Sequence, residues 1–205
     1  MLAGSLRRLV LDFPYRAFYT DNGEFQLAIT FGRAFRRHIA IEDFVSIADS
    51  LSFNVRQGEP DYRCVAWSTW PRLRRLSLRS PYIDEKFVEA LLQCRRLTHL
   101  VVAEPKGLDS SLPGHLADRV SGAGLGLRRM TVVQYGVRPH LSLSTRLMVT
   151  FADGAPASTG RPAMRYVDIP FVLFDPIDRI EAWLREYSLD GTIWESHGHM
   201  YEPAT

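Results

Sequence analysis

Few side chains in this 205-residue sequence have the types and spacing that nucleophilic or metal-dependent chemistry needs. His197 and His199 are two residues apart, so both imidazoles can lie on one face of a strand, but a zinc site needs a third ligand. Cys64 could serve as a thiol nucleophile only with a histidine from a distant part of the sequence to activate it. We therefore predict no catalytic residue, no metal site and no cofactor.

Motifs that would indicate a known catalytic or nucleotide site are missing. The sequence contains neither Gly-x-Ser-x-Gly nor the phosphate loop Gly-x-x-x-x-Gly-Lys. Gly122, Gly124 and Gly126 have a spacing like that of a dinucleotide-binding loop, but they precede a predicted strand, whereas such a loop follows one. We interpret this segment as a flexible connection into Leu127.

Arginine is the residue type with an unusual distribution. Of the 25 basic residues only Lys86 and Lys106 are lysine, which leaves 23 arginines against 23 acidic residues and a net charge of +2. Such a small net charge disfavours a nucleic-acid partner. Two cysteines are too few for a disulfide framework, which favours the cytoplasm or the nucleus. No apolar run approaches the length of a membrane span, so we predict no membrane partner.

Four segments share the pattern L-x-x-L-x-L, in which Met or Val replaces some leucines. They begin at Leu6, Leu73, Leu97 and Leu127, and a looser fifth copy covers residues 164–169. In three of the four a proline stands eight residues after the first leucine, and in three that leucine is followed by Arg-Arg. This is the strand pattern of a leucine-rich repeat, and composition alone does not explain such position-specific matches.

The segments between these strands carry helix signals. Asp84 can cap a helix from Glu85 to Cys94, which makes the strands on either side of this crossover parallel. A second helix is predicted from Ile41 to Phe53, where the apolar residues lie on one helical face. A third helix begins at Asp175, which is followed by proline, and ends before Gly191.

Together these patterns predict one α/β domain over residues 1–205. Its architecture is an irregular leucine-rich-repeat-like solenoid, with a curved parallel sheet and helices on the outer face. Asp21-Asn22-Gly23 is a turn signal between two strand-like segments, which predicts a β-hairpin insertion at about residues 13–31. The C-terminal part, from about residue 136 to residue 205, is expected to be irregular.

The residues between the pattern leucines point to the other face of the sheet, which is the concave face of such a solenoid. The residue before the second leucine forms a first column, extended by Tyr166 of the fifth copy. The residue after that leucine forms a second column, extended by Asp168. We predict that a partner binds these columns and the adjoining Arg79. The predicted partner-binding residues are Arg8, Arg75, Ser77, Arg79, His99, Val101, Arg129 and Thr131.

Arginines on adjacent strands of such a column lie about 5 Å apart and repel one another unless a negative charge covers them. This arrangement favours an acidic partner, either a protein segment or a phosphate-bearing ligand. The alternative is that the arginines are solvated, or that they form weak surface pairs with Asp12, Glu104 and Asp168.

The segment from Trp70 to Leu100, with its Leu-Arg-Arg-Leu-Ser-Leu strand and the helix after Asp84, resembles the leucine-rich part of fungal F-box-type proteins. The proteins of mushroom-forming fungi look most similar, and they too have a closing charged helix like the one predicted from Asp175 to Tyr187. In that family an F-box module docks on a ubiquitin-ligase adaptor and the repeats select the substrate. The sequence opens on a repeat strand with no F-box-like segment before it, so no docking residue carries over.

We therefore expect a protein–protein recognition module that binds a partner on the concave sheet face, and the resemblance implies substrate selection for a ubiquitin ligase. Arg8, Arg75, His99 and Arg129 are the leading contacts in this hypothesis. One alternative is a small cytosolic α/β enzyme that uses Cys64 or the pair His197 and His199. Another is a truncated gene product without autonomous function.

Overall fold

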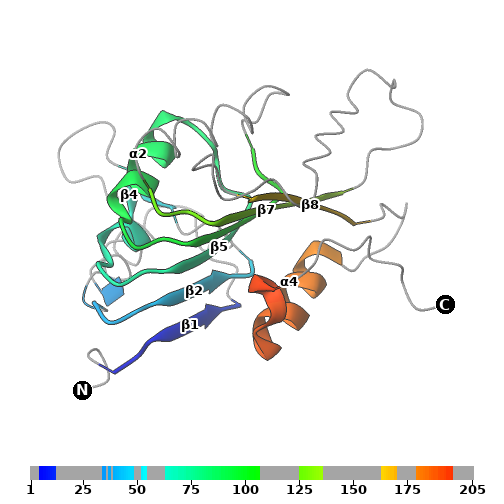
Figure 1. The fold of residues 1–205 in the computed structure, drawn as a ribbon, viewed down its shortest axis with the longest axis horizontal. Helices are drawn as coiled ribbons and strands as arrows, with labels where there is room; N and C mark the ends of the chain where they lie inside the picture. Colours follow the sequence, from blue (N-terminus) through cyan, green and yellow to red (C-terminus); the bar gives the residue numbers. More distant parts are fainter. Residues whose placement is uncertain are drawn as a thin grey trace, which may run out of the picture.

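The computed structural model describes residues 5–12, 34–35, 37, 39–48, 52–54, 63–106, 125–135, 163–169 and 179–195, with the backbone alone described in 52–54, 63–65, 134–135 and 163–169. A six-stranded parallel sheet runs through the described residues in the order β1-β2-β5-β6-β7-β8 (Figure 1). Its strands are β1 (Arg8–Leu11), β2 (Asp43–Ser46), β5 (Arg75–Arg79), β6 (His99–Ala103), β7 (Arg129–Tyr135) and β8 (Ala163–Ile169). A separate antiparallel pair consists of β3 (Ser52–Asn54) and β4 (Arg63–Val65). The protein is therefore α/β.

The strands predicted from the four best copies of the pattern are confirmed, and three of them pair as predicted. Leu76 in β5 lies opposite Leu100 in β6, which lies opposite Met130 in β7. These strands are adjacent, parallel and in sequence order. β1 belongs to the same sheet, but β2 separates it from β5.

The helix predicted from Ile41 to Phe53 is wrong, because this segment contains β2 and β3 instead. Phe44 of β2 lies opposite Leu76 of β5, so β2 lies between the strands of the first two copies of the pattern. Phe44 and Val45 point to opposite faces of the sheet, and both are fully buried. A strand that is apolar on both faces resembles an amphipathic helix over a short window of sequence.

The fifth copy is a strand, β8, but its predicted alignment with the other copies is wrong by three residues. Met164 takes the second apolar position of the pattern rather than the first. Ala163 therefore lies beside Arg129, in the place expected for Tyr166, and Asp168 likewise leaves the second column. β7 and β8 pair over seven residues, and this long ladder rather than the weak sequence match determines the register.

One face of the sheet packs against α2 (Glu85–Gln93) and the 3-10 helix η2 (Ala66–Thr69). Asp84 caps α2 as predicted, and its carboxylate accepts a hydrogen bond from the backbone N–H of Phe87 at 2.8 Å. The apolar positions of the copies that begin at Leu73, Leu97 and Leu127 are buried on this face, where two tryptophans join them. The cluster includes Trp67, Trp70, Leu73, Leu76, Leu78, Phe87, Leu91, Leu97, Leu100, Val102, Leu127, Met130 and Val132.

The repeated proline marks a corner of the backbone that is itself repeated. Ser80 and Glu104 follow β5 and β6, and their φ angles are 49° and 48°. A proline comes next in each case, and the N–H of Lys106 donates to the carbonyl oxygen of Pro81 at 2.8 Å. Residues other than glycine rarely adopt positive φ, so the two corners share an unusual backbone conformation.

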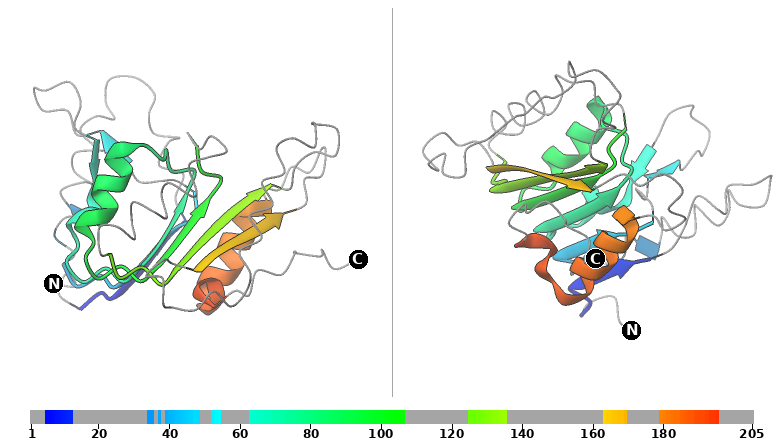
Figure 2. Two further views of the ribbon diagram at one scale, coloured as in Figure 1. Left: turned by 45° about the horizontal axis from the view of Figure 1, so that its top comes forward. Right: turned by 90° about the vertical axis from the view of Figure 1, so that its right-hand side faces the viewer.

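The other face of the sheet is covered by α4 (Arg179–Asp190) and the 3-10 helix η5 (Thr192–Trp194), so α2 and α4 lie on opposite sides of the sheet (Figure 2). The prediction that helices cover only one face is therefore wrong. The physical reason is that the strands also place aliphatic residues on the second face. The second buried cluster consists of Val45, Ile47, Val101, Ala103, Val133, Ile180, Trp183, Leu184, Ile193 and Trp194.

The hairpin predicted at about residues 13–31 lies outside the described residues. Of the irregular part predicted from about 136 to 205, the structure describes β8, α4 and η5. The helix predicted to end before Gly191 is α4, and Gly191 has a φ of 87°, which glycine adopts without strain.

Candidate binding surface where the strands begin

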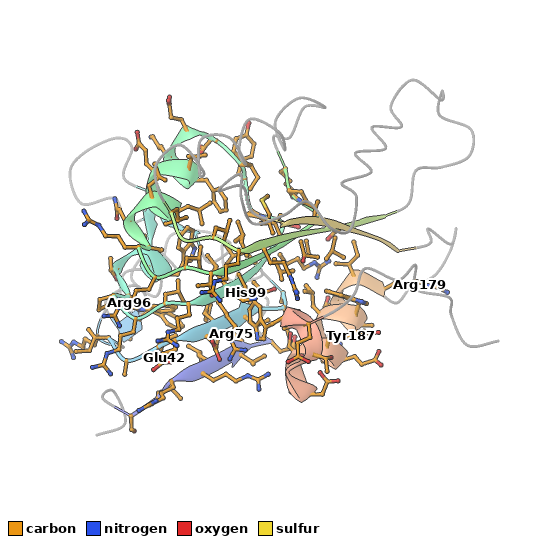
Figure 3. The ribbon with its side chains drawn as sticks, viewed as in Figure 1. Glu42, Arg75, Arg96, His99, Arg179 and Tyr187 are labelled. Atoms are coloured by element: carbon orange, nitrogen blue, oxygen red, sulfur yellow. The ribbon has the colours of Figure 1, made fainter. Side chains whose placement is uncertain are left out.

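Five side chains form a row across the α4-covered face of the sheet, close to the ends where the strands begin. We call it the face row, and strand pairing gives its order as Arg8, Asp43, Arg75, His99 and Arg129. Four of these residues are predicted from the sequence, whereas Asp43 is not. Arg75 and His99 lie on neighbouring strands near the middle of the row (Figure 3).

Asp43 supplies a negative charge within this row. Nε of Arg75 donates to Oδ1 of Asp43 at 2.5 Å, and a second guanidinium nitrogen donates to Oδ2. The Asp43 side chain is only 11% exposed, and a two-bond pair of this kind is stronger than an ordinary surface pair. The Arg75 guanidinium also lies over the ring of Trp194, 5.5 Å from its centre. Arg75 is therefore held against the sheet and η5.

Arg8 and Arg129, at the two ends of the row, bind the C-terminal elements. Arg8 donates a hydrogen bond to the carbonyl oxygen of Ser188 in α4, and Arg129 donates one to the carbonyl oxygen of Trp194 in η5. Carbonyl groups in the last turn of a helix lack intrahelical partners, and cations stabilise them there. Three arginines of the face row, at positions 8, 75 and 129, thus hold the C-terminal segment on the sheet.

His99 lies between Arg75 and Arg129 in the row. Burial lowers the pKa of His99 below its usual 6.5, and the positive charges of Arg129, Arg75 and Arg128 lower it further. Nδ1 of the imidazole lies 2.9 Å from Oγ1 of Thr98. The ring is therefore mostly neutral at pH 7, which avoids a third positive charge between two arginines.

The other predicted partner-binding residues are engaged within the protein. Ser77, Val101 and Thr131 of the second column are at most 2% exposed, because α4 and η5 cover them. Arg79 pairs with Glu104 at 3.1 Å and with Glu181 of α4 at 2.8 Å. The structure therefore places these four residues under the C-terminal segment or against it, and not on an open surface.

A second row of mostly charged residues lies one position earlier in the chain. We call it the turn row, and backbone hydrogen bonds give its order as Arg7, Glu42, Arg74, Thr98 and Arg128. All three arginines of this row are exposed. Arg7 pairs with Glu42 at 3.6 Å. In the part of the chain that the structure describes, Arg74 and Arg128 have no carboxylate partner.

The acidic members of both rows, Glu42 and Asp43, are absent from the predicted site because their segment is predicted as a helix. One signal in the sequence could have found them. Ile41 and Phe44 have the spacing of the first two leucines of the pattern, and only Ser46 departs from it at the third position. Both apolar residues are indeed buried in the same cluster as the pattern leucines.

The side chains weighed as catalytic or metal-binding lie mostly beyond the described structure. His197 and His199 are outside the described residues, and of Cys64 only the backbone, in β4, is described. Burial raises the pKa of Cys94 to about 12, so this thiol does not ionise near neutral pH. Within the described ranges, no three potential metal-ligating side chains come together.

Comparison with family models, with curated proteins and with solved structures finds no match to this chain. Over the described segments, no helix has the length and apolar character needed to cross a membrane. Function is therefore inferred from the two rows of side chains.

Proposed function

We propose that this chain is a protein-recognition module made of leucine-rich-repeat-like units, and that an acidic segment of a partner protein binds along the turn row. The observation that carries this proposal is the pair of exposed arginines, Arg74 and Arg128, which lack a carboxylate partner in the described part of the chain. Their strands are separated by β6 alone, so an extended acidic peptide can contact both.

The repeat interpretation is supported by the shared register of the apolar positions and by the two equivalent corners at Ser80 and Glu104. Each unit adds a strand, and the residue that precedes the strand joins the turn row. A stack of such units therefore builds a row of side chains from a repeated position in the sequence. The resemblance to fungal F-box-type proteins supports the further proposal that the bound partner is a ubiquitin-ligase substrate.

The turn row is the better candidate surface because the face row is already engaged. Arg8, Arg75 and Arg129 bind carbonyl groups, a carboxylate and a ring of the same chain. A partner on the face row would have to displace α4 and η5, which together bury five large apolar side chains to at most 4% exposure. These are Ile180, Trp183, Leu184, Ile193 and Trp194. His99, which is half buried, lies at the border between the two rows.

Selection of peptides from a random display library tests this proposal even though the partner is unidentified. The wild-type protein should enrich peptides with several acidic residues. The double variant Arg74→Glu with Arg128→Glu should bind the enriched peptides at least about tenfold more weakly, because reversed charges repel them. Binding should also weaken as sodium chloride is raised from about 50 to about 500 mM, since exposed charges are screened.

The matched control is Lys86→Glu with Arg95→Glu, which changes the net charge by the same amount at exposed positions outside both rows. This variant should keep most of the wild-type affinity. An equal loss in both variants would mean that only total charge matters, and a selection without acidic enrichment would overturn the proposal.

A further inference from the structure

A pocket of about 300 Å³ opens at the turn row, and three of its five lining residues are arginines. The lining residues are Glu42, Pro71, Arg72, Arg74 and Arg96. They come from three successive units: the residue before β2, the turn that leads into β5, and the turn that follows α2. Glu42 and Arg96 both lie toward the end of the sheet where the strands begin (Figure 3).

The charges around this pocket do not balance. Three guanidinium groups face one carboxylate, which gives the lining a formal charge of +2 at neutral pH. The single carboxylate, Glu42, is also shared with Arg7 at 3.6 Å. Within the described residues, Arg72, Arg74 and Arg96 have no acidic partner. Cations gathered around one small pocket repel one another, and a bound anion would remove that repulsion.

The backbone that carries these side chains is fixed by the sheet. The carbonyl oxygen of Glu42 accepts hydrogen bonds from the N–H groups of Arg74 at 2.7 Å and Arg75 at 3.0 Å. The carbonyl oxygen of Arg74 accepts one from the N–H of Thr98 at 2.8 Å. Leu97, the residue after Arg96, is fully buried. The cationic groups are thus attached to a backbone that does not need to rearrange when a ligand binds, which favours affinity.

We propose that this pocket binds one phosphomonoester dianion. A phosphate monoester carries close to two negative charges at neutral pH, which matches the excess charge of the lining, whereas a carboxylate would leave one positive charge uncompensated. The planar fork of arginine also fits phosphate oxygens with two parallel hydrogen bonds. The dianion can come from a free phosphorylated compound or from a phosphorylated side chain. The pocket shares Glu42 and Arg74 with the turn row, but Arg96 lies outside that row, so phosphate binding is tested separately from the acidic partner.

A comparison of Arg95 with Arg96 distinguishes a role in ligand binding from a role in stabilising the end of α2. Both follow the C-terminal end of α2, where a positive charge stabilises the helix. Both are exposed, but only Arg96 lines the pocket. Arg95→Gln and Arg96→Gln therefore remove the same charge from the same helix end, and only the second removes it from the pocket.

Isothermal titration of the full chain with phenyl phosphate tests the proposal, with a thermal unfolding curve recorded for each variant. Arg96→Gln should weaken binding by tenfold or more, and Arg95→Gln should leave it within twofold. Glu42→Gln should strengthen binding severalfold, because it removes the one negative charge that opposes the ligand. This increase cannot result from a folding defect, so it distinguishes a binding site from a damaged structure.

Further titrations identify the source of the dianion. A five-residue peptide with a central phosphoserine, the same peptide with glutamate in its place, and a ten-nucleotide RNA are compared with phenyl phosphate. Tighter binding of the phosphopeptide supports a phosphorylated side chain as the source, and equal binding supports a free compound. The proposal is overturned if the glutamate peptide binds as well as the phosphopeptide, or if the RNA binds tightest and its binding depends on Arg96. It is also overturned if the Arg95 and Arg96 variants lose the same amount of affinity for phenyl phosphate.

Discussion

The two faces of the parallel sheet are both buried, but they are built from different residues. The α2 face contains the leucines of the repeated pattern and two tryptophans, and it is almost entirely apolar. The α4 face has aliphatic residues such as Val101 beside Ser77 and Thr131, and arginines border it where the strands begin. A sheet face that includes polar residues can therefore still be covered by a helix when arginines at the border of the face bind that helix.

The difference between the faces is seen most directly within one strand. In β6, Leu100 points to the α2 face and Val101 to the α4 face, and both are almost fully buried. Parallel sheets are typically covered on both faces because crossovers place helices there. Here the second cover comes from α4 and η5, which follow the last strand of the sheet.

The largest effect is expected on the α2 face. Leu100→Ala should lower the free energy of unfolding by about 3 kcal/mol, because it leaves a cavity among buried leucines. Urea unfolding followed by circular dichroism measures this loss. The exposed Arg95→Ala serves as the control, with an expected change within about 0.5 kcal/mol.

The next effect tests whether the α4 face is covered in solution. Val101→Ala should cost about 1.5 to 2 kcal/mol, since two buried methyl groups are lost under the C-terminal segment. The same urea experiment gives the value. If this face were open to solvent, the substitution would be nearly neutral, within about 0.5 kcal/mol. That result would overturn the arrangement in which α4 and η5 cover the face.

A smaller effect is expected for the ion pair in the face row. Asp43→Asn should lower the free energy of unfolding by about 1 kcal/mol, because Arg75 keeps its charge in a partly buried place without its carboxylate. Asp12→Asn is the matched control, since the pair of Asp12 with Arg185 has a similar geometry but is more exposed at both ends. Its expected cost is about 0.5 kcal/mol or less. Equal losses in the two variants would mean that burial adds nothing to the face-row pair.

The smallest effect is the pH dependence that His99 contributes. Its pKa is lowered in the folded protein, so the unfolded chain binds the proton more readily and stability falls as pH decreases through about 6.5. At a pH low enough to protonate His99 in the folded protein as well, the loss of stability caused by this group reaches its full size. Urea unfolding at about pH 7.5 and about pH 5.5 should therefore show a smaller difference for His99→Asn than for the wild type. An unchanged difference would show that His99 does not contribute.

Much of the sheet could be predicted because its apolar positions recur with a fixed spacing. Leu73, Leu76 and Leu78 have the same spacing as their counterparts in the copy that begins at Leu97, and both sets are buried. The spacing did not predict β2, because Ser46 interrupts the pattern and because Val45 makes the strand apolar on both faces. Without β2, neither Asp43 nor Glu42 could be placed beside the arginines.

Four members of the face row could also be predicted, since they occupy one position of the pattern. Their partners could not be predicted, because these partners are distant in the sequence. Arg8 bonds to Ser188, which is 180 residues away, and Arg79 pairs with Glu181 across 102 residues. The pocket around Arg96 likewise combines three turns that only strand pairing brings together.

The sequence by itself determined that the four clear copies of the pattern form strands and which side of each of these strands carries the apolar residues, because this information is local and repeats along the chain. It also determined that the residues at one position of the pattern, among them Arg75 and Arg129, form a row, since a parallel sheet in register brings a repeated position together. Only the tertiary structure decided which of these arginines are engaged within the protein and which remain exposed. That outcome depends on where α4 and η5 pack, and their packing follows from buried contacts between residues far apart in the chain.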